Sequence, residues 1–301
     1  MTPASPLQVA PEWPLRLWRN SREPRLLERL WEKTDEGKRY RSRLEIHRTQ
    51  SGLLLKIDCE GKGSFEYRPE GIGVHWQKGG TEADHYFQTL GAALWLELKG
   101  VPCIHANALD TGEGAIGLVA PSRTGKSTLT GALLDAGLAV MTDDMMALHP
   151  HREGWRVHPA WPRLRLWPDT VQLLFRRLPE ELERVHRRFD KRVLELEPTH
   201  GRRVGPRPLK GFYLLERRGE RQGEIRITRL SAGEAMVHLL QNSMLADAYR
   251  PLKLEAGRLK RLAAVAESVP FRRISYPSGL EHLPTVVQAI LGRERGAARN
   301  D

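Results

Sequence analysis

Hydrophobic and polar positions follow different periods in successive parts of the chain. Apolar residues recur at helical spacing over residues 24–31, which predicts a helical arm that packs on the body of the protein. Between Arg43 and Trp76 apolar and polar residues alternate in short runs broken by turn residues, which predicts antiparallel strands. Residues 83–99 again carry apolar side chains at helical spacing and precede Gly100, so they predict an amphipathic helix.

The next forty residues predict a hairpin followed by a helix and another strand. Residues 101–109 and 115–120 are apolar runs joined by a turn over residues 110–114. Leucines then recur at helical spacing until Gly137, and residues 138–141 form a further apolar run. This is a βαβ unit of the expected size, and the predicted fold class is therefore α/β.

The loop inside this unit matches a phosphate-binding pattern. Residues 120–127 are Ala-Pro-Ser-Arg-Thr-Gly-Lys-Ser, against the pattern GxxxxGK[ST], with Ala120 in place of the first glycine. In such a loop the amides surround the phosphates, the lysine reaches the β- and γ-phosphates and the serine hydroxyl binds Mg²⁺. A chance match in a surface loop is the alternative, and the flanking strand and helix argue against it. The predicted nucleotide-binding residues are Ser122, Arg123, Thr124, Gly125, Lys126, Ser127 and Thr128, with Ser127 also a metal ligand.

His105 is a candidate for catalysis because of the predicted hairpin. If the turn is centred near Gly112, His105 lies opposite about Val119, close to the phosphate loop. A lone histidine in an apolar strand is otherwise a hydrogen-bonded core residue, and the hairpin favours the functional interpretation.

Two adjacent acids, Asp143 and Asp144, follow the last strand of the unit. In parallel α/β sheets the ligand crevice lies outside the carboxyl ends of the strands, which is where this pair falls. Because neighbouring residues of a strand point to opposite sides, one carboxylate can bind Mg²⁺ while the other faces an incoming hydroxyl. The alternative is an acidic turn or a helix cap.

Two arginines form a candidate clamp for phosphate or for a substrate carboxylate. Residues 161–167 alternate in a period of two, so Arg163 and Arg165 share one face of a predicted strand. A solvated sheet face explains the same pattern equally well.

Composition and charge restrict the class of protein. The chain has 301 residues, 28% of them charged and 40% hydrophobic, and no apolar run long enough for a membrane span. The formal net charge of +11 favours anionic partners. Nucleic acid is not the expected partner, because the basic residues are dispersed and lack interleaved aromatic residues. The first residues lack an export signal, so the expected location is the cytoplasm.

Neither repeats nor a clear linker divide the chain. We therefore expect one compact unit, in which residues 1–100 form an arm, antiparallel strands and an amphipathic helix packed on a core formed by residues 101–301. The two cysteines are too few for a zinc site.

Three segments together resemble a known family. His105-Ala-Asn-Ala-Leu, the loop over residues 120–127 and Val140-Met-Thr-Asp-Asp144 resemble, in order and spacing, the kinase domain of bacterial HPr kinase/phosphorylase. That family is distantly related to the phosphoenolpyruvate carboxykinases. The chain is most similar to the stand-alone HPr-kinase-like proteins encoded with lasso-peptide biosynthesis enzymes, which resemble a kinase acting on the C-terminal serine of a precursor peptide.

The resemblance implies a P-loop kinase core and a role for each matching residue. Lys126 and Ser127 match the ligands of the ATP triphosphate and Mg²⁺. Asp143 matches the general base that takes the serine proton, His105 matches the histidine beside that base, and Asp144 matches a carboxylate near the metal. The residues themselves leave open which aspartate is the base. The resemblance further implies a homo-oligomer.

The expected function is therefore ATP- and Mg²⁺-dependent transfer of the γ-phosphoryl group to a serine hydroxyl of a peptide, such as the C-terminal serine of a lasso-peptide precursor. Alternatives within the enzymes are a kinase of an HPr-type protein and a kinase of a small metabolite. An alternative of another class is a regulatory P-loop NTPase that binds nucleotide or nucleic acid. The family's downstream phosphorylase motif has no clear counterpart here, so reverse phosphorolysis is not expected.

Overall fold

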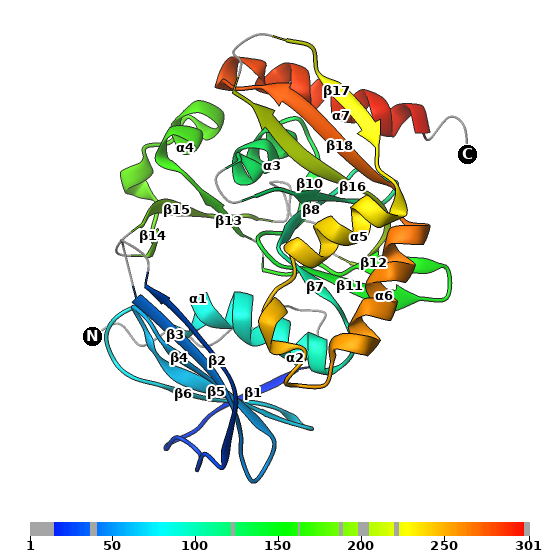
Figure 1. The fold of residues 1–301 in the computed structure, drawn as a ribbon. Coiled ribbons are helices and arrows are strands. Elements are labelled where there is room, and N and C mark those ends of the chain that lie inside the picture. The colour runs from blue at the N-terminus through cyan, green and yellow to red at the C-terminus, as the bar shows by residue number, and fades with distance from the viewer. Residues whose placement is uncertain are drawn as a thin grey trace.

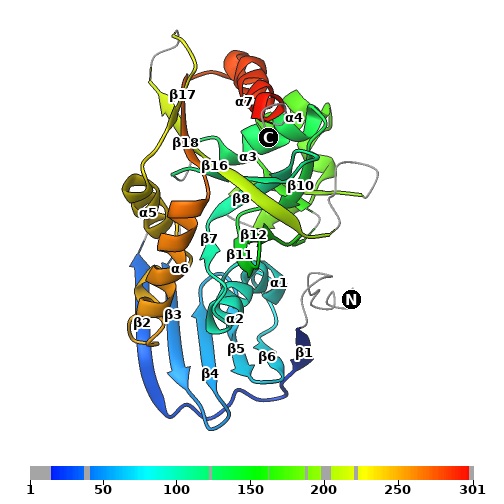
Figure 2. The same ribbon diagram turned by 90° about the vertical axis from the view of Figure 1, so that its right-hand side faces the viewer.

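The computed structural model describes residues 15–36, 41–121, 124–161, 163–186, 189–197, 205–219 and 223–297. Within them the chain has a mixed α/β fold with a six-stranded, a nine-stranded and a three-stranded sheet (Figures 1 and 2). None of the helices in these ranges combines the length and hydropathy needed to cross a bilayer.

The first sheet has the order β1-β6-β5-β4-β3-β2, and all its neighbours are antiparallel except β1 and β6. Its strands are β1 Arg16–Arg19, β2 Glu28–Glu36, β3 Arg41–Arg48, β4 Leu53–Asp58, β5 Lys62–Arg68 and β6 Gly71–Trp76. The alternation predicted between Arg43 and Trp76 is therefore confirmed. One face of the sheet buries an apolar cluster that includes Ile46, Leu55 and Phe65.

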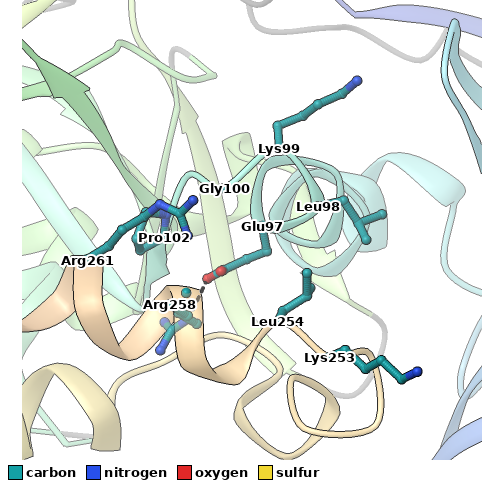
Figure 3. A pocket seen from close by; sticks show the side chains of 10 residues that line it. Glu97, Leu98, Lys99, Gly100, Pro102, Lys253, Leu254, Arg258 and Arg261 are labelled. Atoms are coloured by element: carbon teal, nitrogen blue, oxygen red, sulfur yellow. Dashed lines mark hydrogen bonds and ion pairs between the residues drawn. The ribbon is translucent and has the colours of Figure 1, made fainter.

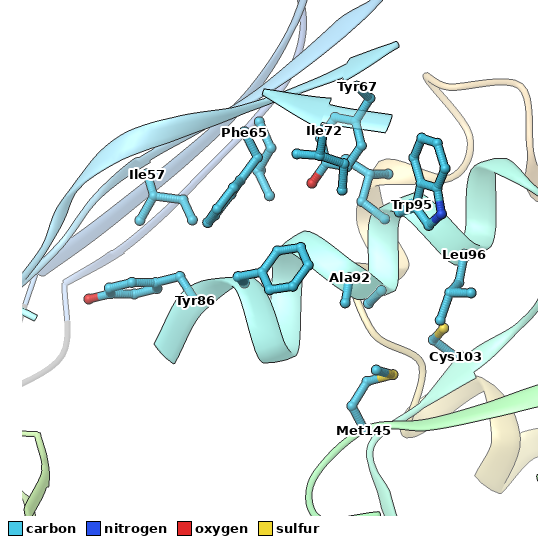
Figure 4. Packing of buried hydrophobic residues seen from close by; sticks show 14 of the residues in the cluster. Ile57, Phe65, Tyr67, Ile72, Tyr86, Ala92, Trp95, Leu96, Cys103 and Met145 are labelled. Carbon is cyan, nitrogen blue, oxygen red and sulfur yellow. The ribbon is translucent and has the colours of Figure 1, made fainter. Parts of the chain in front are cut away.

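A helical segment covers that buried face. It consists of α1 Ala83–Tyr86, a π-helical turn Phe87–Gly91 and α2 Ala92–Leu98, and Gly100 follows with a positive φ of 79°. The helix predicted over residues 83–99 is confirmed, apart from the π turn, where the Gly91 carbonyl accepts a hydrogen bond from the Tyr67 hydroxyl (3.0 Å). Figure 4 shows Met145 and Cys103 of later segments on the opposite side of these helices from Phe65.

The helical arm predicted over residues 24–31 is wrong. Glu28–Glu36 form β2, which pairs antiparallel with β3, and only Trp31 among its residues is buried. Leu27, which immediately precedes this strand, is half exposed. Short apolar runs fit both periods, and here the backbone hydrogen bonds offered by β3 and the burial of the Trp31 ring decide for a strand.

The nine-stranded sheet carries the phosphate loop. Its path is β10-β8-β9-β16-β12-β11-β7, with β18 beside β16 and β17 beside β18. The strands are β7 Cys103–Ile104, β8 Ala106–Asp110, β9 Ala115–Val119, β10 Ala139–Thr142, β11 Met146–His151, β12 Gly154–Val157, β16 Arg207–Arg218, β17 Arg226–Arg229 and β18 Phe271–Pro277.

The predicted hairpin and βαβ unit lie at one side of this sheet, where β10 is the edge strand. β8 and β9 are antiparallel, with Ala106 opposite Val119, one residue from the register predicted for His105. α3 (Lys126–Asp135) then leads to β10, which pairs with β8 on the side away from β9. β9 and β10 are both antiparallel to β8. The carboxyl ends of β9 and β10 and the amino end of β8 therefore lie at the same end of the strands.

Helices cover both faces of this sheet, as Figures 1 and 2 show. They are α3 and α7 Leu283–Ala297 on one face and α5 Ala232–Gln241 and α6 Glu255–Ser268 on the other, while α4 Pro168–Phe175 packs on α3. Buried residues of α3 and α7 share one apolar cluster, and those of α5 and α6 share another. The third sheet, β13 Arg163–Leu166, β14 Arg184–His186 and β15 Phe189–Glu195, packs by its leucines into the α3 cluster.

Candidate functional site

The phosphate loop connects a fully buried strand to a helix whose first two residues are also buried. All five residues of β9 are buried, and α3 begins at Lys126 after Gly125, whose φ of 99° lies in the left-handed region. Only glycine adopts such a φ without strain, so Gly125 is required by the backbone as well as by the pattern. Ser122 and Arg123 lie outside the described residues. Thr124 is partly exposed.

The side chain of Lys126 extends from α3 to β8 and to the residues that follow β10. Its side chain is buried, with 7% of the residue exposed, and its ammonium group donates hydrogen bonds to Asn107 Oδ1 (2.8 Å) and Asp144 Oδ1 (2.9 Å). Three chain segments are thus joined at one cation. A buried ammonium needs oxygen ligands, and here they come from β8 and from the segment that follows β10.

Asn107 holds this arrangement together, and no role was assigned to it from the sequence. It is fully buried on β8, and its Oδ1 also accepts the backbone N–H of Asp144 (3.0 Å). Its Nδ2 donates to Thr130 Oγ1 (2.8 Å), which in turn donates to the Lys126 carbonyl (2.9 Å). A buried amide with both ends satisfied fixes its neighbours. The signal available in the sequence was an asparagine within the apolar strand predicted over residues 101–109, two residues from His105.

Asp144 is the carboxylate on which the charged groups converge. Besides Lys126, His105 Nε2 lies 3.4 Å and Arg165 Nη1 3.5 Å from its carboxylate oxygens. Its φ of 62° is left-handed, which is uncommon outside glycine. Burial alone would raise its pKa, but Lys126 and the hydrogen bond from His105 hold the pKa well below its usual range.

Asp143 differs from its neighbour in both contacts and pKa. Its Oδ2 accepts the backbone N–H of Arg165 (2.8 Å), whereas its Oδ1 is buried without a hydrogen-bond partner. Burial and the charge of Asp144 raise its pKa to about 6, although Arg165 and Lys126 oppose the shift. The two carboxylates therefore differ in basicity although they are adjacent in the chain.

The two arginines of β13 do not act as a matched pair. Arg165 is buried, reaches Asp144 and also donates Nη2 to Gln88 Oε1 (3.3 Å) of the π turn. Arg163 pairs with Glu195 instead, with Nε 3.5 Å from Oε1. Of the predicted clamp, the structure brings only Arg165 to the two aspartates.

His105 and the first turn of α3 complete the site. The His105 side chain is 40% exposed, so it lies on the open side of Asp144. Its backbone N–H donates to the Asn242 carbonyl (2.7 Å), which holds the residue between β7 and β8. Ser127 is buried at the start of α3, and Thr128 Oγ1 lies 3.1 Å from Thr170 Oγ1 of α4.

The described residues contain no group of three or more His, Cys, Asp or Glu that could hold a metal by themselves. Mg²⁺ is commonly held by one or two protein oxygens together with waters and substrate phosphates. The hydroxyl of Ser127 and the carboxylate of Asp144 are oxygen donors of the required kind, and the 2.9 Å contact with Lys126 shows that the Asp144 position already binds a cation.

Comparisons with known proteins add one structural similarity. No protein-family model matches the sequence, and no curated protein matches it. Among solved structures, the Hpr(Ser) kinase/phosphatase from Coxiella burnetii matches with 12% sequence identity and a TM-score of 0.36, over 65% of this chain and 98% of that chain. At this level of similarity, the chemistry of the site has to be inferred from its own residues.

Proposed function

We propose that the protein is an ATP- and Mg²⁺-dependent kinase with a P-loop core of the HPr kinase type. The observation that carries the proposal is the convergence of Lys126, at the start of the helix after the loop, with His105 and Asp144 at one sheet edge. An ammonium, a helix amino end and paired carboxylates at the carboxyl ends of strands are the groups that phosphoryl transfer requires.

Lys126 and the amino end of α3 would bind the triphosphate. In the ligand-free arrangement Lys126 is neutralised by Asp144, and a triphosphate offers its ammonium a more highly charged partner. Asn107 limits where that ammonium can go, because it holds both the Lys126 side chain and the Asp144 backbone. Arg165 adds a second positive charge beside the carboxylates.

The two aspartates would divide the remaining work. Ser127 and Asp144 would hold Mg²⁺, which supplies charge neutralisation on the phosphoryl oxygens when it is bound. Asp143, with a pKa of about 6, would accept the acceptor proton. The serine oxygen forms a bond to the γ-phosphorus, the bond to the leaving ADP oxygen breaks, and the proton moves to Asp143. His105 contacts Asp144, so it would orient the metal-side carboxylate.

The acceptor is proposed to be a serine of a peptide, in particular the C-terminal serine of a lasso-peptide precursor. The support is the likeness of the segments around His105, the loop and Asp143-Asp144 to stand-alone HPr-kinase-like proteins, together with a net charge of +11 that suits an acidic peptide. The division at residue 100 and a homo-oligomeric state belong to the same proposal.

The test is phosphate transfer by the purified full-length protein. Incubation with ATP, Mg²⁺ and a precursor-type peptide ending in serine should add the mass of a phosphate, and the same peptide ending in alanine should stay unmodified. Lys126→Ala should lower the rate at least about 100-fold, because one preorganised charge contact is removed. Lys78→Ala is the matched control, since Lys78 is exposed.

The alternatives are distinguished by the same assay. Phosphorylation of an HPr-type protein or of a small metabolite, with no transfer to the peptide, would retain the kinase and reject the peptide acceptor. ATP hydrolysis without transfer to any hydroxyl would reject the kinase in favour of a regulatory NTPase. Equal transfer rates in Lys126→Ala and the unaltered protein would remove the site assignment itself.

A further inference from the structure

A polar pocket lies between α2 and α6. It has a volume of about 330 Å³ and shares no residue with the candidate site (Figure 3). It is lined by Glu97, Leu98, Lys99, Gly100, Pro102, Lys253, Leu254, Gly257, Arg258 and Arg261. A volume of this size lies at the lower end of the range for small-molecule sites, and five of its ten lining residues are charged.

The pocket carries a large positive charge for its size. Four of its lining residues are cationic and only Glu97 is anionic, which leaves a net charge of three positive units. Clustering of like charges is unfavourable unless a counter-ion is bound. The amino end of the 14-residue helix α6 faces the same space, through Lys253, Leu254 and Gly257, and adds positive potential.

A buried ion pair forms the floor of the pocket. Arg258 is only 4% exposed and donates Nε to Glu97 Oε1 (2.9 Å), while its Nη2 lies 3.4 Å from the Cys103 carbonyl. Its guanidinium lies over the Tyr249 ring, 4.4 Å from the ring centroid. The three hydrogen bonds to Glu97, from Arg258, Tyr249 and the Cys103 N–H, all end on Oε1. The floor is therefore rigid and already neutralised.

The charge of Arg261 is not neutralised by the Glu97–Arg258 pair at the floor of the pocket. Within the described part of the chain Glu97 pairs with Arg258, and Arg261 has no carboxylate partner. Its guanidinium lies against two glycines: a Cβ on Gly100 would come within 2.7 Å of Nη2, and one on Gly257 within 3.1 Å of Nη1. Figure 3 shows Arg261 beside the Glu97–Arg258 pair, whereas the side chains of Lys99 and Lys253 extend outward.

We propose that this pocket binds a small phosphate-type oxyanion, with Arg261 as its principal ligand. A planar guanidinium held in a fixed place binds two oxygens of such an anion at once. Lys99 and Lys253 at the rim contribute attraction at longer range. The excess of three charges favours a doubly charged phosphate over a singly charged carboxylate. The inference is independent of the proposed kinase activity, because the pocket and the phosphate loop use different residues.

The test is the binding of inorganic phosphate, measured by isothermal titration calorimetry. Phosphate replaces chloride in the buffer, so that the ionic strength stays constant. Because a phosphate loop also binds phosphate, the measurement is made in the Lys126→Ala protein. One site should remain there. Adding Arg261→Ala should weaken that site at least about tenfold, since one charge-assisted contact is lost. Adding Lys260→Ala, an exposed neighbour on the same helix that does not line the pocket, should leave it unchanged.

Each result decides between the proposal and its rivals. No binding in Lys126→Ala, or equal binding in the Arg261→Ala and Lys260→Ala backgrounds, overturns the pocket. Equal weakening by both substitutions would indicate general surface charge and would also overturn it. Far-UV circular dichroism and the unfolding midpoint of each variant establish that the fold is intact. Failure of the kinase assay leaves this result unaffected, because no ATP is present.

Discussion

The two aspartates show how neighbouring residues of one type acquire different chemistry. Asp144 faces Lys126 and His105, whereas one oxygen of Asp143 is buried without a partner. The adjacency and the strand end could be recognised in the sequence. The causes that separate the two pKa values could not, because they are the burial of Asp143 and the contacts of Asp144 with Lys126 and His105, which depend on how the fold brings these segments together.

Asp143→Asn should stabilise the ligand-free protein at neutral pH while it removes activity. The pKa of Asp143 is raised to about 6 in the fold, so the folded state retains a proton that the unfolded chain loses near pH 4. Stability from this group therefore falls as pH rises from about 4 to 6 and stays low above that. The variant should gain about 1–3 kcal/mol at pH 7.5 and nothing at pH 4.

Thermal unfolding at the two pH values measures this difference, and Asp135→Asn at the end of α3 is the matched control. If Asp143 is the base, the rate of the unaltered protein should also fall below pH 6, and the small residual rate of Asp143→Asn should not show this fall. The same gain in unfolding midpoint at both pH values would show that Asp143 is not the buried, basic carboxylate described above.

At the scale of elements, local sequence patterns were sufficient to predict the helices and strands around the phosphate loop. The hairpin β8–β9, the helix α3 and the strand β10 all lie within forty residues, and turns and glycines mark their ends. The arm over residues 24–31 was predicted wrongly although its partner, β3, is the next strand in the chain, because a short apolar run fits both periods and the pairing with β3 decides between them. The third sheet, β13-β15-β14, was missed as a unit because β13 and β15 pair residues that are about thirty positions apart.

The turn from β9 into α3 allows a test of what the loop glycine contributes. Gly125→Ala places a Cβ at a φ of 99°, where no atom of the described residues lies within 4 Å, so the expected cost is backbone strain of about 1–2 kcal/mol rather than a clash. Gly112→Ala is a matched control, with a φ of 96° and equally open space in the β8–β9 turn. Both should lower the unfolding midpoint by about 2–8 °C. Only Gly125→Ala should weaken ATP binding; equal ATP affinity in the two variants would argue against a nucleotide at this loop.

At the scale of the whole molecule, the six-stranded sheet is joined to the remainder through α2. The apolar cluster beneath that sheet also contains Cys103, Met145 and Ala248 from later segments, which Figure 4 shows in part. Glu97 of α2 adds a polar connection, because it pairs with Arg258 of α6, 161 residues away. No feature of the sequence predicted this pair, since neither residue stands in a motif.

The Glu97–Arg258 ion pair allows a test of how much the contact between α2 and α6 contributes to stability. Arg258→Met leaves the buried Glu97 carboxylate without its cation, which should cost about 3–5 kcal/mol. Burial already raises the pKa of Glu97, and Arg258 opposes the shift, so removing Arg258 raises it further. The unfolded chain then releases the Glu97 proton at lower pH than the folded protein does, and the loss of stability should be larger at pH 8 than at pH 5.

Arg261→Met, on the same helix but outside the pair, should show little loss and no such pH dependence. Adding Glu97→Leu to Arg258→Met should recover part of the stability, because no buried charge remains. If thermal unfolding shows that the loss in the double variant equals the sum of the losses in the two single variants, the two side chains do not stabilise each other.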